Sequence, residues 1–192
     1  RAFSDTTMEL ALGGYPGFHT TTPPSAESAF GVYWPTLVPA SEVEHLVTLP
    51  DGTTTPVPHS PATAGIPVPA EPVVPAPVAG PTRRLPLGEI AAARSGDKGG
   101  NANIGLWTRT DDEYAWLRGH LTVERVRELL PEAAGLEIRR FDLPNLRALN
   151  IVVVGILGAG VASATRPDPQ AKGLGEYLRS RLVDVPVALL PG

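Results

Sequence analysis

The second half of the chain has a regular succession of apolar runs that predicts alternating strands and helices. Five short runs rich in apolar or β-branched residues are typical of strands. They occupy residues 87–93, 102–108, 136–141, 149–157 and 185–189. Two longer segments have apolar residues at helical spacing, and they occupy residues 113–132 and 170–182. This half is therefore predicted to have a mixed α and β structure.

The two helical segments also carry signals for their ends. In the first, Gly119 marks a break, and Thr122 is a candidate N-cap for a second helical piece. In the second, Leu174, Leu178 and Leu182 lie one turn apart and share a face. From residue 102 onward the order is β-α-β-β-α-β, the split βαβ arrangement of ferredoxin-like folds. We expect an α+β domain of this type with one extra strand before it.

Proline separates this half from the residues before it. Ten of the 22 prolines fall between Pro56 and Pro86. Each proline ring fixes φ and removes an N–H donor, so the stretch is predicted to be extended, polyproline-like chain. We place a Pro-rich linker at 57–84. The alternative is an ordered Pro-rich strap that lies across a surface.

The residues before the linker hold little periodic apolar sequence. Residues 8–12 and 43–49 are interpreted as short strands, and residues 13–17 and 50–52 as turns. Because this is too little apolar sequence to bury a core alone, we expect these strands to complete a sheet whose other strands are absent from the chain.

The chain also opens without Met and without a signal-peptide pattern. We therefore interpret residues 1–56 as the C-terminal tail of a larger α/β domain. The predicted organisation is this tail, the linker at 57–84, and the ferredoxin-like domain at 85–192.

Composition and charge narrow the function classes. There are no cysteines, so thiol chemistry and disulfides are excluded, and we expect a cytoplasmic protein. The longest apolar run, 151–157, is too short to span a membrane. Residues 1–80 carry a net charge of −6 and residues 81–192 a net charge of +2. Neither part has the dense stripe of Lys and Arg that a nucleic-acid-binding protein needs.

The densest polar cluster spans residues 94–105, between two apolar strands. It combines charged, hydroxyl and amide side chains with four glycines, which let the backbone approach an anion closely. A solvent-exposed hairpin is the alternative explanation for the glycines and the Asp and Asn residues. A simple turn does not require Arg94, Ser95 and Lys98 together. Nor does it require Asn101 and Asn103, which alternation places on one side of the strand.

Two known motifs nearly match this cluster. Residues 95–98 fit the S-x-x-K pattern in which a lysine activates a serine nucleophile, but the accompanying S-D-N and K-T-G elements are absent. The glycine spacing does not fit the G-x-x-x-x-G-K-[ST] pattern of a phosphate-binding loop. We therefore expect neither a Ser95 nucleophile nor ATP hydrolysis.

Two smaller polar groups follow. Residues 139–150 read as a tight β-β connection, but Asn150 opens the most apolar strand and needs a partner, which we expect in the first cluster. Residues 166–172 precede the last helix, where Asp168 is interpreted as a cap. The four histidines are scattered, so no metal site is predicted. Trp34, Trp107 and other aromatic residues are interpreted as packing groups.

Three segments together resemble one known family. They are residues 93–105, residues 143–150 and residues 168–172, where Ala171 stands at a position that is usually Gly. They are similar to the C-terminal ferredoxin-fold domain of the acyclic terpene utilisation (AtuA) family, over about residues 85–190. Upstream, Tyr15-Pro16-Gly17, Pro23-Pro24 and Tyr33-Trp34-Pro35 resemble the tail of that family's larger N-terminal domain.

The resemblance implies a role in the catabolism of acyclic terpenoids such as citronellol and geraniol, or of related branched acids. Under the enzyme hypothesis the full protein acts on a small carboxylate or its CoA thioester, with lyase or hydratase chemistry. Asp97 and Lys98 are then the candidate catalytic residues. The candidate substrate-binding residues are Arg94, Ser95, Asn101, Asn103 and Asn150.

The alternative is a non-catalytic binding or subunit-assembly module, so whether the chain is an enzyme stays open. No cofactor is predicted, although a CoA thioester is a candidate substrate. We expect the N-terminal part of the family protein as a partner, and a homo- or hetero-oligomer. Neither nucleic acid nor membrane is expected as a partner. Convergence of the cluster residues on one concave pocket would favour the enzyme hypothesis.

Overall fold

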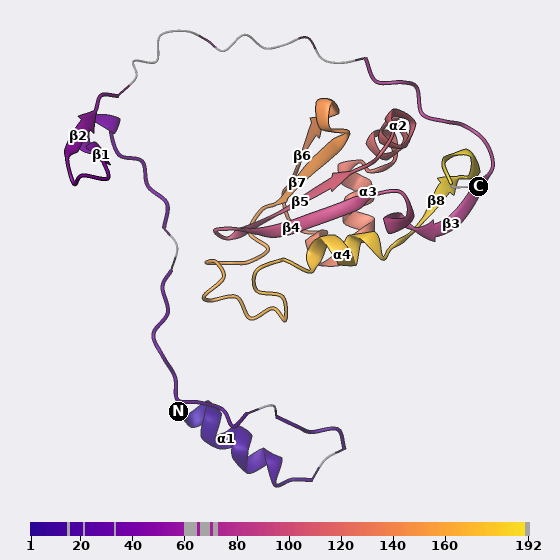
Figure 1. Cartoon of the computed structure of the whole chain (residues 1–192). Helices are drawn as coiled ribbons and strands as arrows, with labels where there is room; N and C mark the ends of the chain where they lie inside the picture. Colours follow the sequence, from indigo (N-terminus) through magenta and orange to yellow (C-terminus); the bar gives the residue numbers. More distant parts are fainter. Residues whose placement is uncertain are drawn as a thin grey trace. The chain divides into compact units, whose positions relative to one another are not determined.

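The described residues of the computed structural model fall into two units, Arg1–Gly31 and Val32–Gly192, which we treat separately (Figure 1). The structure describes residues 1–14, 16–20, 22–32, 34–59, 65, 70 and 73–190. The central part of the predicted linker, together with Tyr15 and Tyr33, therefore lies outside the described residues.

The first unit contains one helix, α1 (Ala2–Ala11), among its described residues. The predicted strand at 8–12 is therefore wrong. Met8, Glu9 and Leu10 are good helix formers. A helix also satisfies its own backbone hydrogen bonds, whereas a strand without a neighbour leaves them unpaired. None of the α1 residues is buried.

A hairpin stands at the start of the second unit, after a short 3₁₀ turn at Ala40–Glu42. It pairs β1 (His45–Thr48) with β2 (Thr54–Val57). Asp51 stabilises the connecting turn, because its carboxylate accepts a hydrogen bond from the Thr53 N–H at 2.9 Å. The predicted strand and turn are confirmed here. All eight strand residues are exposed.

The main body is a four-stranded antiparallel sheet with the strand order β4-β5-β7-β6. The strands are β4 (Ala92–Lys98), β5 (Asn101–Trp107), β6 (Ile138–Leu143) and β7 (Ala148–Val153). Strand β7 pairs with both β5 and β6, so β5 and β6 run parallel with β7 between them. This is the split βαβ unit, and the ferredoxin-like α+β fold is confirmed.

Three helices accompany the sheet: α2 (Asp111–His120), α3 (Val123–Leu129) and α4 (Leu174–Arg179) (Figure 1). Alternate strand residues point toward them and form the core with the buried faces of the helices. Those strand residues are Ala102, Ile104, Leu106, Leu149, Ile151 and Val153. Each fully buried Leu, Ile or Val side chain stabilises the fold by roughly 1.5–3 kcal/mol. The opposite face of the sheet, which we call the open face, does not have to be apolar, because it does not pack against these helices.

The predicted break in the first helical segment is confirmed. Helix α2 ends at His120, and the Thr122 side chain accepts a hydrogen bond from the Arg125 N–H at 3.2 Å as the N-cap of α3. At the start of α2, Thr110 and Glu113 form a reciprocal capping box. These local polar bonds satisfy helix-terminal N–H groups that would otherwise lack partners.

The predictions for the first and last strands need correction. Residues 87–89 form a 3₁₀ turn, not a strand, and β4 begins at Ala92. The last strand, β8 (Leu182–Pro186), begins earlier than predicted and pairs with β3 (Thr82–Pro86) in a separate two-stranded sheet. Strand β4 thereby occupies the edge position beside β5. Short apolar runs do not distinguish a strand from a buried turn, and they do not specify a pairing partner.

The aromatic residues divide between core and surface. Trp116 is buried, as expected for a packing group, whereas Trp107 is 42% exposed and Trp34 is 88% exposed. The packing prediction is therefore wrong for these two tryptophans. Trp107 ends strand β5, where the register decides which face its side chain takes, and the register cannot be read from one strand alone. Trp34 lies outside any helix or strand.

The β4–β5 turn packs against the loop that follows β7. The Leu157 N–H donates to the carbonyl oxygen of Gly100 at 2.9 Å, and the Gly155 N–H donates to Oδ1 of Asn101 at 2.9 Å. A Cβ atom on Gly100 would be forced against the carbonyl oxygen of Gly158. Glycine at this position lets two backbone segments approach each other closely.

We predict that Gly100→Ala destabilises the fold by about 1–3 kcal/mol, because the added methyl group displaces the Gly158 carbonyl. Chemical denaturation of the purified chain measures the effect. Gly96→Ala is the matched control in the same hairpin, since a Cβ there meets nothing within 4 Å. Equal stability of the two variants would contradict the predicted clash.

His120 makes stability dependent on pH. Its ring stacks on Trp116 with the ring centroids 4.7 Å apart. Burial lowers the pKa of His120 below the ordinary value of 6.5, and the positive charge of Arg125 lowers the pKa further. As the pH falls below 6.5, the unfolded chain takes up a proton that the folded chain does not. The contribution of His120 to stability is therefore fully present above this pH. It is lost as the pH falls toward the lower pKa that His120 has in the folded chain.

We expect His120→Gln to weaken this pH dependence, because glutamine does not titrate. The measurement is the free energy of unfolding at about pH 7.5 and about pH 5.5, on either side of the ordinary histidine pKa. The original chain should lose more stability than the variant over this interval. An identical loss in both would exclude His120 as the cause.

Candidate functional site

The open face carries side chains in cross-strand rows that change from polar to apolar. One row runs Arg94, Gly105, Asn150 and Phe141 across β4, β5, β7 and β6. The next row toward the end of β5 runs Ala92, Trp107, Ala148 and Leu143. The row on the other side contains Asn103. The antiparallel register thus places the polar cluster of β4 and β5 beside a group of apolar residues.

A cavity of about 400 Å³ lies at the free edge of β4, and we call it the polar cavity. Because β4 is an edge strand, residues from both of its faces reach this cavity. The lining residues are Arg94, Ser95, Gly96, Asp97, Lys98, Asn103, Gly105 and Lys172. Five of the seven predicted site residues therefore share one concave surface.

Ser95 anchors the strand to helix α4. Its side chain is buried, accepts a hydrogen bond from the Gly175 N–H at 2.8 Å and donates one to the Lys172 carbonyl oxygen at 3.2 Å. A Cβ on Gly175 would lie only 3.2 Å from the Ser95 hydroxyl, so glycine permits this close approach. Ser95 and Lys98 point to opposite faces of β4, so Lys98 is not placed to activate the Ser95 hydroxyl.

Asp97 and Lys98 also alternate across β4. The Lys98 ammonium group donates to the backbone carbonyl oxygen of Asp97 at 2.8 Å, and these two residues form no ion pair with each other. Both side chains line the polar cavity. The arrangement offers a carboxylate on one side of the strand edge and an ammonium group on the other.

The amide residues have different surroundings. The Asn103 side chain donates to Oδ1 of Asn150 at 3.3 Å, so Asn150 meets the first cluster as predicted. Asn101, in contrast, accepts the Gly155 N–H and holds the loop after β7. It is not among the residues that line the polar cavity.

Lys172 lines the cavity although it was not among the predicted site residues. The Asp168 carboxylate accepts hydrogen bonds from the N–H groups of Lys172 and Gly173, both at 2.9 Å. Ala171 adopts the left-handed conformation with φ of 52°, which completes the turn. This turn carries Lys172 to Ser95. Lys172 belongs to residues 168–172, one of the three segments that carry the family resemblance. Only the fold shows that this segment contacts the first polar cluster.

The charges at the polar cavity favour an anion. Arg94, Lys98 and Lys172 are positive, and Asp97 is the only acidic residue in the lining. Within the part of the chain that the structure describes, the Arg94 guanidinium makes no hydrogen bond or ion pair. Such a group is available to bind a carboxylate in a bidentate manner.

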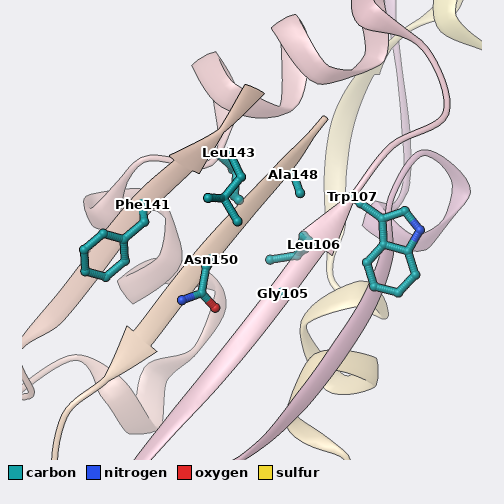
Figure 2. A pocket seen from close by; sticks show the side chains of 8 residues that line it. Gly105, Leu106, Trp107, Phe141, Leu143, Ala148 and Asn150 are labelled. Carbon is teal, nitrogen blue, oxygen red and sulfur yellow. The ribbon is translucent and has the colours of Figure 1, made fainter. Parts of the chain in front are cut away.

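A second cavity of about 450 Å³ lies on the open face, and we call it the apolar pocket. Figure 2 shows Phe141 and Trp107 on either side of Asn150 and Ala148. Leu143 completes the apolar surface. Phe141 is 48% exposed and Leu143 is 39% exposed. Sequence patterns did not identify this pocket, because its residues come from three strands.

Among the residues with described positions, no group of three or more His, Cys, Asp or Glu residues is placed to hold a metal ion. Across the same part of the chain, no helix combines the length and the apolar character required to cross a membrane.

A family model for the AtuA ferredoxin-like domain matches residues 85–184. The match covers more than half of the chain and all three segments discussed above, so the chain belongs to the AtuA family. No curated protein and no solved structure matches the chain. The family suggests a role in the context of acyclic terpene utilisation.

We predict that Ser95→Ala lowers the stability of the fold by about 1–3 kcal/mol, because the buried Gly175 N–H loses its acceptor. Thermal and chemical unfolding measure the loss. Ser180→Ala is the control, since its exposed hydroxyl donates only to the Tyr177 carbonyl oxygen. Full stability of Ser95→Ala would show that the hydroxyl does not anchor α4.

Proposed function

We propose that the polar cavity binds a small carboxylate or an acyl-CoA thioester in the degradation of acyclic terpenoids, such as citronellol and geraniol, or of branched acids. The observation that carries this proposal is the excess of positive charge in the cavity. Three cationic side chains from two distant segments line the cavity, together with one carboxylate. Family membership supports the same metabolic context.

The chemistry of such a substrate assigns roles to the cavity residues. A lyase or hydratase reaction moves a proton at a carbon near the carbonyl group and develops negative charge on the carbonyl oxygen. The Asp97 carboxylate is the candidate base for the proton. The Lys98 ammonium group and the Asn103 amide are candidate donors to the developing charge. Arg94 and Lys172 then hold the anionic part of the substrate.

A non-catalytic assembly module is the second candidate, and the β1–β2 hairpin favours it. A lone two-stranded hairpin is marginally stable in water. Leu46 and Val57 of this hairpin are about half exposed, at 54% and 43%. Docking of these residues on another protein surface would bury them. This candidate requires neither Asp97 nor Lys98 to act on a substrate.

We expect small carboxylates and branched acyl-CoA esters to bind the 192-residue chain, and Lys98→Ala and Arg94→Ala each to weaken binding about fivefold. That factor corresponds to ~1 kcal/mol for a solvent-exposed ion pair. Calorimetric titration with isovalerate and isovaleryl-CoA provides the measurement. Binding should also weaken as the salt concentration rises, because salt screens exposed charges.

Arg83→Ala is the matched control, because it removes one exposed positive charge that lines no described cavity. If Arg83→Ala weakens binding as much as Lys98→Ala, the attraction comes from overall charge and the cavity is not the site. If no carboxylate or thioester binds, and Asp97→Asn leaves the activity of the full family protein unchanged, the assembly candidate is favoured.

A further inference from the structure

The polar cavity and the apolar pocket share one residue, Gly105. In the β-sheet register Gly105 lies directly between Arg94 on β4 and Asn150 on β7. The Asn103–Asn150 hydrogen bond also joins one residue of each cavity. The two cavities are therefore adjacent parts of one surface.

Gly105 leaves the boundary between them open. A Cβ at this position would meet only the Arg94 carbonyl oxygen, at 3.7 Å, which is an ordinary contact. The backbone conformation of Gly105 is also one that other residues adopt. The fold thus tolerates a side chain here, and one would project over the boundary between the two cavities. Glycine interior to a strand commonly marks a close approach of a ligand or another backbone.

The dimensions suit an extended molecule. Residues two apart on a strand lie about 7 Å from each other, so the surface from Asn103 past Gly105 to Trp107 spans about 14 Å. Its polar end has cationic side chains, and its other end has Trp107, Phe141 and Leu143. A medium-length acyl chain with an anionic head has the matching length and polarity.

We propose that this surface binds an amphipathic carboxylate, with its head group in the polar cavity and its hydrocarbon tail across Gly105 in the apolar pocket. The head-group part rests on the proposed function, whereas the tail site is additional. A second copy of the chain would be the other occupant. A stable dimer interface needs about 20–30 residues on each side, far more than the few that form the apolar pocket. A dimer contact at this pocket would also leave the adjacent cations without a role.

The test is a titration of the 192-residue chain with butyrate, hexanoate and octanoate, followed by NMR chemical shifts. We expect each added methylene group to tighten binding about twofold to fourfold, as burial of apolar surface requires. The Trp107 indole resonance should shift with octanoate and not with butyrate. Octanol, which lacks the anionic head, should bind more weakly than octanoate.

The discriminating variant is Gly105→Val, whose β-branched side chain suits a strand and blocks the boundary. It should weaken octanoate binding at least tenfold and weaken butyrate binding by a much smaller factor, because Gly105 borders the polar cavity but only the octanoate tail has to cross it. Val152→Leu is the matched control, because it adds bulk on the same sheet face and lines neither cavity. This control should bind all three acids as the original chain does.

The other outcomes separate the two proposals. Butyrate and octanoate binding with equal affinity would overturn the tail site and leave the carboxylate site standing. A lack of binding by every acid would overturn both. If octanol bound as tightly as octanoate, the anionic head group would contribute nothing to binding, and the proposal of an amphipathic carboxylate would be overturned. Sedimentation that shows a dimer disrupted by Phe141→Asp would assign the apolar pocket to a second copy instead.

Discussion

The buried hydroxyl of Ser95 joins the parts of the domain on which the candidate site depends. It accepts from the Gly175 N–H in α4 and donates to the Lys172 carbonyl oxygen just before this helix. These bonds hold the edge strand β4 against α4 and bring Lys172 to the charged end of β4. Without these two bonds, the segment that carries Lys172 could move away from β4, which carries Arg94 and Lys98. A residue that sequence patterns suggested for substrate binding thus has a clear structural role as well.

Strand alternation distributes the remaining chemistry. The face of β5 and β7 that meets the helices must be apolar, and Ile104 and Ile151 satisfy this requirement. The open face has no such constraint, so Asn103, Asn150 and Trp107 are not explained by core packing. An exposed sheet face is ordinarily polar. Its combination of paired amides, cations and exposed aromatic rings therefore bears on function more than the core residues do.

Local signals predicted the helix cap and helix break correctly, but they did not predict the helix at Ala2–Ala11 or the long-range strand pairing. The Thr122 cap and the break before it depend on hydrogen bonds between near neighbours, so sequence alone was sufficient. The pairing of β8 with β3 depends on residues far apart in the chain, as in the pair Arg84 and Asp184, which are 100 positions apart. Lys172 was missed for the same reason. The first cluster was recognised because its residues are contiguous, but the contact with α4 that shapes it is visible only in the fold.

The position of Gly105 connects these points. A strand residue without a side chain weakens the strand slightly, since glycine loses more backbone entropy on folding than other residues. The sheet does not require glycine there, because a Cβ would fit. At Gly100, in contrast, a Cβ would overlap the Gly158 carbonyl oxygen, and at Gly175 it would make a tight contact of 3.2 Å with the Ser95 hydroxyl. Folding therefore explains two of these three glycines, and the third lies where two cavities of opposite character meet. Access across the sheet surface is the physical explanation that remains for it.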